Sequence, residues 1–140
     1  MRNFTKLILI FLLMFSANIF AEDKVHKLVI QVSTKDFNTQ KIALSNAINV
    51  QKHYGMDNVI IELVAYGPGL ELVTDKSFQD SRVRSLIAQD IIFTACGNTM
   101  DTIKRKTGRY PTLIDGVTKV QTGVARIIEL QEQGYSYIRP

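Results

Sequence analysis

Residues 91–100 read Ile-Ile-Phe-Thr-Ala-Cys-Gly-Asn-Thr-Met, and this stretch decides the fold. Its first five residues are mainly β-branched or aromatic, which predicts a short buried strand over Ile91–Ala95. Gly97 and Asn98 then predict a turn, and Asn98 or Thr99 is a suitable N-cap for a helix that runs to about Lys106. The stretch therefore predicts a strand, a turn and a helix, with Cys96 at the junction.

Cys96 is the only cysteine of the chain. In open α/β sheets, ligands and reactive groups collect beyond the carboxyl ends of the strands. A thiol there also lies near a helix N-terminus, whose partial positive charge favours the thiolate. The alternative is a small buried residue with a packing role only. The pattern of residues leaves both interpretations open.

The same alternation of strands and helices extends along the chain in both directions. The apolar runs are nearly continuous, which is typical of strands that are buried on both faces of a parallel sheet. We therefore expect a single α/β domain. The expected strands are Lys27–Ser33, Val59–Tyr66, Ile91–Ala95, Val117–Val120 and Tyr135–Ile138. The expected helices are Asn38–Tyr54, Ser77–Asp90, Asn98–Lys106 and Thr122–Gln133.

The first 21 residues have the three-part pattern of a secretory signal peptide. Arg2 and Lys6 precede the unbroken apolar run Leu7–Phe15, and Ala21 ends a stretch of polar and small residues. The apolar run is far shorter than the ~20 residues that a membrane-spanning helix needs. We therefore expect cleavage near Ala21, a mature domain over residues 22–140, and a periplasmic or secreted protein with no membrane attachment.

Composition excludes several classes of function. The net charge of +4 includes Arg2 and Lys6 of the expected signal peptide, so the mature domain keeps little basic character for nucleic acid. The chain has no glycine-rich phosphate loop. Its two histidines, His26 and His53, are far apart, and it has no Cys-x-x-Cys, so we expect neither a metal site nor a bound cofactor.

Several segments of the chain together resemble the DsrE/DsrF-like family, in particular its small exported members. These segments are Val29–Ser33, Ala43–Gln51, Glu62–Leu70, Ala95–Met100 and Glu132–Pro140. The resemblance implies a three-layer α/β/α sandwich around a mostly parallel sheet of about five strands, and a tendency to form oligomers. The characterised relatives carry sulfur as a persulfide on one cysteine at the end of a strand, a role that only Cys96 can match here.

Two functions follow as expectations. In the first, Cys96 accepts sulfur from a donor protein and passes it to an acceptor. Gly97, Asn98 and Thr99 then supply N–H groups to the anion, and Tyr66, Gly67 and Gly69 form the opposite wall of a substrate site. In the second, the chain is a non-catalytic oligomeric scaffold or small-ligand-binding module whose cysteine is structural. A homo-oligomer is expected in both cases.

Export is directly testable from the sequence. Mass spectrometry of the protein recovered from its native host should give a mature chain that begins near Glu22, because the residue pattern ends at Ala21. A chain that retains Met1 in the cytoplasmic fraction would contradict this prediction.

Overall fold

The computed structural model describes residues 25–140. The expected signal peptide and its cleavage point lie outside the described residues. The five strands form one sheet in the order β4-β3-β2-β1-β5, and every neighbouring pair is parallel. The strands are β1 (His26–Val32), β2 (Val59–Ala65), β3 (Ile92–Cys96), β4 (Thr118–Val120) and β5 (Ser136–Ile138). This arrangement confirms the α/β fold class.

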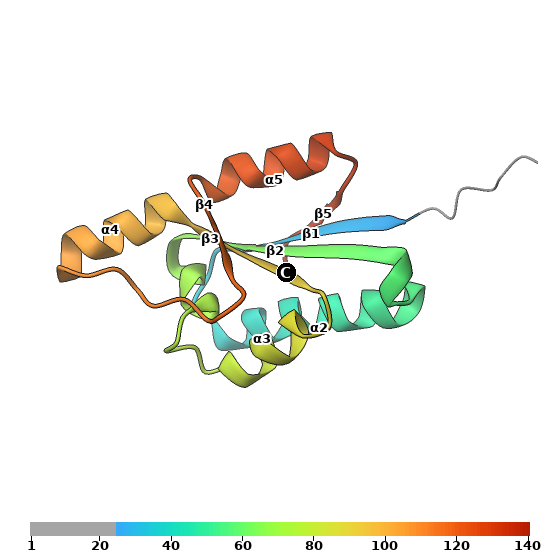
Figure 1. Cartoon of the computed structure of the whole chain (residues 1–140), viewed down its shortest axis with the longest axis horizontal. Coiled ribbons are helices and arrows are strands. Elements are labelled where there is room, and N and C mark those ends of the chain that lie inside the picture. The colour runs from blue at the N-terminus through green and yellow to red at the C-terminus, as the bar shows by residue number, and fades with distance from the viewer. Residues whose placement is uncertain (1–24) are drawn as a thin grey trace, which may run out of the picture.

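Helices cover the two faces of the sheet unequally (Figure 1). α2 (Phe37–Tyr54) and α3 (Asp80–Ile87) lie on one face, and α5 (Gly123–Glu132) lies on the other. α4 (Gly97–Thr107) projects beyond the end of the sheet instead of covering a face. The result is a three-layer sandwich in which one outer layer is a single helix.

The hydrophobic core follows this asymmetry. The larger cluster lies between the sheet and the α2/α3 layer and contains fully buried residues such as Ile30, Leu44 and Phe93. The smaller cluster lies under α5 and consists of four buried residues, Val29, Val64, Ile127 and Leu130. The α5 layer therefore has less apolar area to hold it in place than the α2/α3 layer has.

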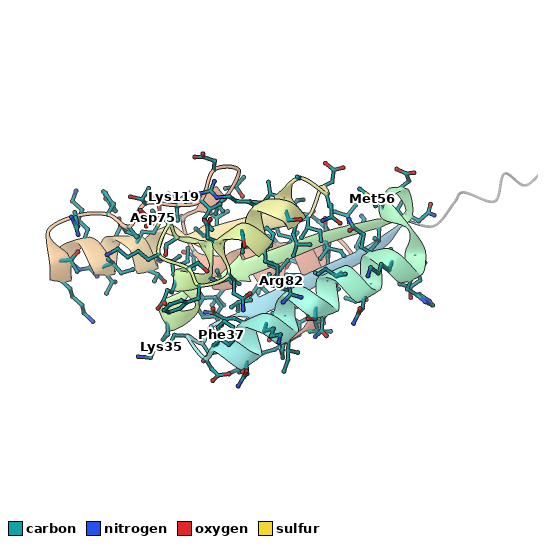
Figure 2. The ribbon with its side chains drawn as sticks, turned by 90° about the horizontal axis from the view of Figure 1, so that it is seen from below. Lys35, Phe37, Met56, Asp75, Arg82 and Lys119 are labelled. Carbon is teal, nitrogen blue, oxygen red and sulfur yellow. The ribbon has the colours of Figure 1, made fainter. Side chains whose placement is uncertain are left out.

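The N-cap of α2 lies two residues before Asn38, where the sequence pattern places the start of this helix. The Asp36 carboxylate accepts hydrogen bonds from the backbone N–H of Thr39 at 2.7 Å and from its hydroxyl at 2.8 Å. Asp36, and not Asn38, is therefore the N-cap, because its side chain reaches the free N–H groups of the first turn. Figure 2 shows this helix running below the sheet, from Lys35 and Phe37 at the carboxyl edge to Met56 at the opposite edge.

The segment after β2 is a 3₁₀ helix, η2 (Gly67–Val73). Gly69 lies inside it and packs against the end of β1. A Cβ atom at this position would lie 2.2 Å from the carbonyl oxygen of Val32. Only glycine permits this close approach of two backbones, so the residue fixes the path of the chain at the carboxyl edge of the sheet.

No helix within residues 25–140 combines the length and the hydrophobicity needed to cross a bilayer.

Candidate functional site

Cys96 is both the last residue of β3 and the residue that caps α4. Its backbone is extended, with φ −77° and ψ 116°, and α4 begins at the next residue, Gly97. Asn98 and Thr99, expected as caps, instead lie inside the first turn of the helix, because the strand continues directly into the helix with no intervening loop. Cys96 is 5% exposed, so its sulfur lies just below the surface at the carboxyl edge of the sheet.

The N-terminus of a second helix packs on the same cysteine. A Cβ atom placed on Gly123, the first residue of α5, would lie 3.2 Å from Cβ of Cys96 and 3.2 Å from Cβ of Tyr66. The absence of a side chain at Gly123 therefore lets the first turn of α5 contact both residues. The N-termini of α4 and α5 converge on the Cys96 side chain.

Side-chain and backbone hydrogen bonds join three chain segments around Cys96. The N–H of Gly67, after β2, donates to Oγ1 of Thr99 at 2.9 Å. The Asn98 side chain donates to Oγ1 of Thr122 at 3.1 Å and accepts from Nε2 of Gln121 at 2.7 Å. The backbone N–H of Asn98 donates to the Gln121 carbonyl at 3.0 Å. These bonds hold the chain segments that follow β2, β3 and β4 in one fixed cluster.

Two opposing effects set the acidity of Cys96. Burial raises the pKa of the thiol, because it disfavours the anion. The hydroxyl of Thr99 and the backbone N–H groups of Gly123, Thr99 and Asn98 act in the other direction, and the net effect is a lowered pKa. The hydroxyl of Thr99 already accepts a bond from Gly67, so its proton is free to point at the sulfur.

These donors stabilise the thiolate selectively. The side chain of Cys96 makes no capping hydrogen bond to α4 in the structure. The N–H groups therefore gain a partner mainly when the sulfur becomes charged, which is the condition for lowering a pKa. The N–H of Asn98 contributes least, since the Gln121 carbonyl already accepts its hydrogen.

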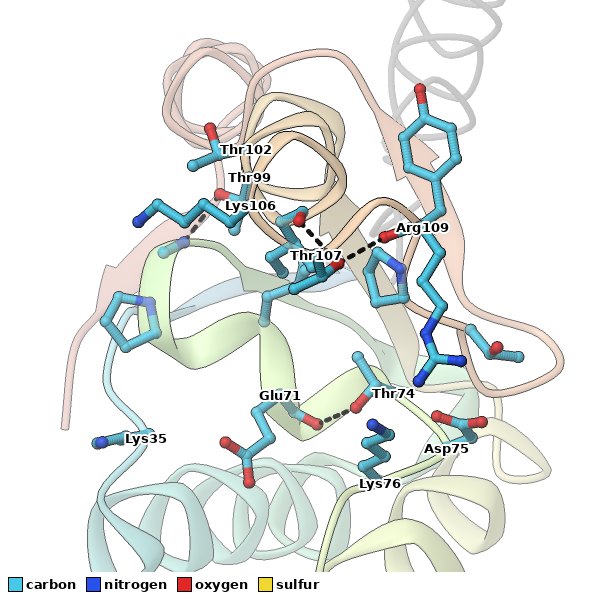
Figure 3. A pocket seen from close by; sticks show the side chains of 17 residues that line it. Lys35, Glu71, Thr74, Asp75, Lys76, Thr99, Thr102, Lys106, Thr107 and Arg109 are labelled. Carbon is cyan, nitrogen blue, oxygen red and sulfur yellow. Dashed lines mark hydrogen bonds between the residues drawn. The ribbon is translucent and has the colours of Figure 1, made fainter.

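A groove begins beside this cluster and follows α4 outward (Figure 3). It has a volume of about 860 Å³ and lies between η2, α4 and residues 109–112. Thr99, Thr102 and Lys106 lie along its upper side, and Glu71, Thr74 and Asp75 lie along its lower side. Gly67 and Thr99 line the groove, whereas Cys96 does not.

The charged side chains of the groove are unpaired with one another. They are Lys35, Glu71, Asp75, Lys76, Lys106 and Arg109. None of the six takes part in an ion pair among residues 25–140. The groove therefore offers both cationic and anionic groups to a ligand, with cations in excess.

The histidines lie at the other end of the molecule. His26 opens β1 and stacks on the Tyr54 ring at a centroid distance of 3.7 Å, and His53 meets the same ring edge-on at 4.6 Å. β1 ends at the same edge of the parallel sheet as β3, so His26 and Cys96 occupy opposite edges. No Cys–His pair forms, and residues 25–140 contain no group of three metal-ligating side chains.

The structure brings together five of the expected substrate-site residues, Tyr66, Gly67, Gly97, Asn98 and Thr99, around Cys96. Gly69 has a different contact, the backbone of Val32. The sequence pattern predicts a helix from Thr122 but does not indicate that Gln121, Thr122 and Gly123 lie in the site. A helix-capping threonine followed by glycine, directly after the strand that pairs with β3, is the signal that points to them.

Two solved protein structures are similar to this chain. No protein-family model and no curated protein sequence matches the chain. A solved structure of a protein of unknown function, MTH1491 from Methanobacterium thermoautotrophicum, is similar with a TM-score of 0.74 and 30% identity. The match covers 82% of this chain and 99% of that one. The ychN protein of E. coli is similar with a TM-score of 0.60 and 15% identity over the same shares, which shows a common fold.

The lowered pKa of Cys96 predicts how the substitution Thr99→Val changes the pH dependence of its alkylation. We expect the wild-type thiol to be alkylated with a midpoint pH below the ordinary value of about 8.5. Removing the hydroxyl donor should raise this midpoint by about 0.7 units, since a hydrogen bond is worth ~1 kcal/mol. The measurement is the rate of alkylation by iodoacetamide as a function of pH, with Cys96→Ser as the blank.

Thr102→Val is the matched control. Its hydroxyl donates to the Asn98 carbonyl at 3.0 Å, one turn further along the same helix. This variant should keep the wild-type midpoint, as should Thr99→Ser. Equal midpoints in Thr99→Val and wild type would show that Thr99 does not act on the sulfur.

Proposed function

We propose that this chain, which belongs to the same family as the MTH1491 protein, is an exported DsrE/DsrF-like sulfur carrier. Cys96 holds the sulfur as a persulfide. One observation supports this proposal above the others: the only thiol of the chain lies where the N-termini of α4 and α5 converge, with the Thr99 hydroxyl beside it. Such an environment favours a thiolate at neutral pH.

The proposed reaction is an exchange of one sulfur atom. The Cys96 thiolate attacks the outer sulfur of a donor persulfide, R–S–SH. The donor S–S bond breaks as a new S–S bond forms on Cys96, and the proton of the outer sulfur passes to the departing thiolate, which leaves as R–SH. An acceptor thiolate repeats the exchange in the opposite sense. No electrons are gained or lost overall, so the reaction needs neither a metal nor a redox cofactor.

Each residue near Cys96 has a part in this proposal. The N–H groups of Gly123 and Thr99 stabilise the negative charge first on the thiolate and then on the outer sulfur. Gly97 has no side chain, and a Cβ there would lie 3.0 Å from the carbonyl oxygen of Val120, so the loop after β4 can close over the start of α4. Tyr66 and Gly67 form the wall on the side of β2.

A second candidate function is the binding of a small ligand in the groove. The groove volume of about 860 Å³ is within the usual range for ligand sites, and its lining combines apolar and unpaired charged groups. In that case Cys96 is a packing residue. The two functions differ in whether the thiol of the folded protein reacts.

Assembly into a homo-oligomer is also part of the proposal. Four large apolar side chains on the sparsely covered α5 side of the sheet or on α5 itself are exposed: Ile60 at 37%, Ile92 at 37%, Val124 at 48% and Ile128 at 52%. Burying such residues against a second copy is favourable.

Light scattering at tens of micromolar should give a multiple of the chain mass, and a strict monomer would contradict this expectation.

Loading with sulfur tests the carrier function. The folded protein is incubated with inorganic polysulfide, desalted and weighed intact. We expect a gain of one sulfur atom per chain in wild type and none in Cys96→Ser. The bound sulfur should leave on addition of cyanide, which removes sulfane sulfur.

Thr99→Val should load more slowly than wild type at neutral pH, because fewer of its molecules carry the thiolate. A wild-type chain that stays unmodified by polysulfide would refute the carrier function. A thiol that also resists iodoacetamide until the chain is unfolded would show that Cys96 is a packing residue. The ligand-binding function would then be the one to pursue.

A further inference from the structure

A buried carboxylate lies under α5, in the middle of the sheet. Glu62 is the fourth residue of β2 and is 1% exposed. Its Oε1 accepts hydrogen bonds from Nε of Arg126 at 2.9 Å and from the Thr94 hydroxyl at 2.7 Å, and its Oε2 accepts from Nη2 of Arg126 at 2.8 Å. The carboxylate and the guanidinium therefore form a two-point pair that fixes direction as well as distance.

This pair acts on the first turn of α5. Arg126 comes three residues after Gly123, and its backbone N–H donates to the Thr122 carbonyl at 3.1 Å, which closes that turn. The apolar contacts of the helix with the sheet include those of Ile127 and Leu130 with Val29 and Val64. Apolar contacts are non-directional and allow a helix to rotate or slide. The Glu62–Arg126 ion pair restricts this movement of α5, because its hydrogen bonds are directional.

A contribution to folding stability does not by itself explain why Glu62 and Arg126 form an ion pair at this position. The Glu62 carboxylate loses its hydration on burial, although 29% of the Arg126 side chain stays exposed. Apolar residues of similar volume often stabilise a protein as well as such a pair or better. The pair is placed where orientation matters instead: between the strand that leads to Tyr66 and the helix that begins at Gly123. Both of those residues contact Cys96 or each other.

We propose that the Glu62–Arg126 ion pair is a positioning device that holds the N-terminus of α5 against the Cys96 sulfur. Arg126 is a positioning residue that acts through Gly123, and Glu62 is its anchor in the sheet. This inference rests on the proposed function of Cys96 as a reactive thiol, and it assigns control of that thiol to residues that do not touch it.

The direction in which the pKa of Cys96 changes distinguishes a positioning role of the ion pair from a purely electrostatic effect of its charges. Loss of the Arg126 cation would raise the pKa of Cys96 by either mechanism. Loss of the Glu62 anion would lower this pKa if only charge mattered, because a nearby negative charge disfavours a thiolate. If positioning dominates, loss of Glu62 raises the pKa as well. Arg126 then keeps Glu129, 3.6 Å away on its own helix, and loses its anchor in the sheet.

The experiment measures the midpoint pH of alkylation by iodoacetamide in Arg126→Gln and Glu62→Gln, without any sulfur donor. We expect the midpoint to rise by about half a unit in both variants, which is about a threefold slower reaction at neutral pH. Arg82→Gln is the matched control, because Arg82 donates to Ser45 at 2.9 Å on the opposite face of the sheet. It should change unfolding by urea without moving the midpoint.

Two outcomes would overturn the proposal. A midpoint that rises in Arg126→Gln and falls in Glu62→Gln indicates a charge effect only. Unchanged midpoints in both variants indicate a purely structural pair. Should Arg126→Gln fail to fold, Arg126→Lys replaces it, and a midpoint equal to wild type in that variant counts against positioning. Sulfur loading is measured separately, so a chain that holds no persulfide but shows both rises would refute the carrier function and leave this inference intact.

Discussion

The site depends on one constraint, the parallel direction of all five strands. Each strand must end at the same edge of the sheet, so the residues that follow β2, β3 and β4 meet there although they are far apart in sequence. The bond from Gly67 N–H to Thr99 and the bonds of Asn98 with Gln121 and Thr122 are consequences of this geometry. An antiparallel neighbour of β3 would place its following loop at the opposite edge, away from Cys96.

The parallel direction of the strands also places the N-termini of two helices next to the Cys96 sulfur. A helix that follows a parallel strand begins at the carboxyl edge, so its free N–H groups point toward that edge. Cys96 occupies the cap of α4, and Gly123 brings the start of α5 within contact. Burial of the sulfur opposes ionisation, and the convergent donors favour it by a larger amount. The balance is local, because helix-terminus effects decay within the first turn.

The helices on the two faces of the sheet are held by different kinds of interaction. The α2/α3 face is held by a large apolar cluster, which gives most of the burial but little directional information. The α5 face has a small apolar cluster beside a buried carboxylate, an arginine and a threonine. The hydrogen bonds on this second face restrict the orientation of α5, and they lie next to the helix end that contacts Cys96.

The class of fold follows from the sequence alone, because nearly continuous apolar strands such as Val59–Ala65, alternating with helices, are local patterns that can be recognised without a partner segment. The sequence also determined that Cys96 would follow a strand and precede a helix. Local patterns did not place the caps. Asp36 and Asn38 are equally good capping residues, and Cys96 takes the cap of α4 because β3 continues directly into that helix. Tertiary structure alone decided that Gly123 contacts Cys96, that Glu62 is buried against Arg126, and that Gly69 packs on Val32. Each of these contacts joins residues on different strands or helices, and its distance is set by strand order and helix packing, which no single segment encodes.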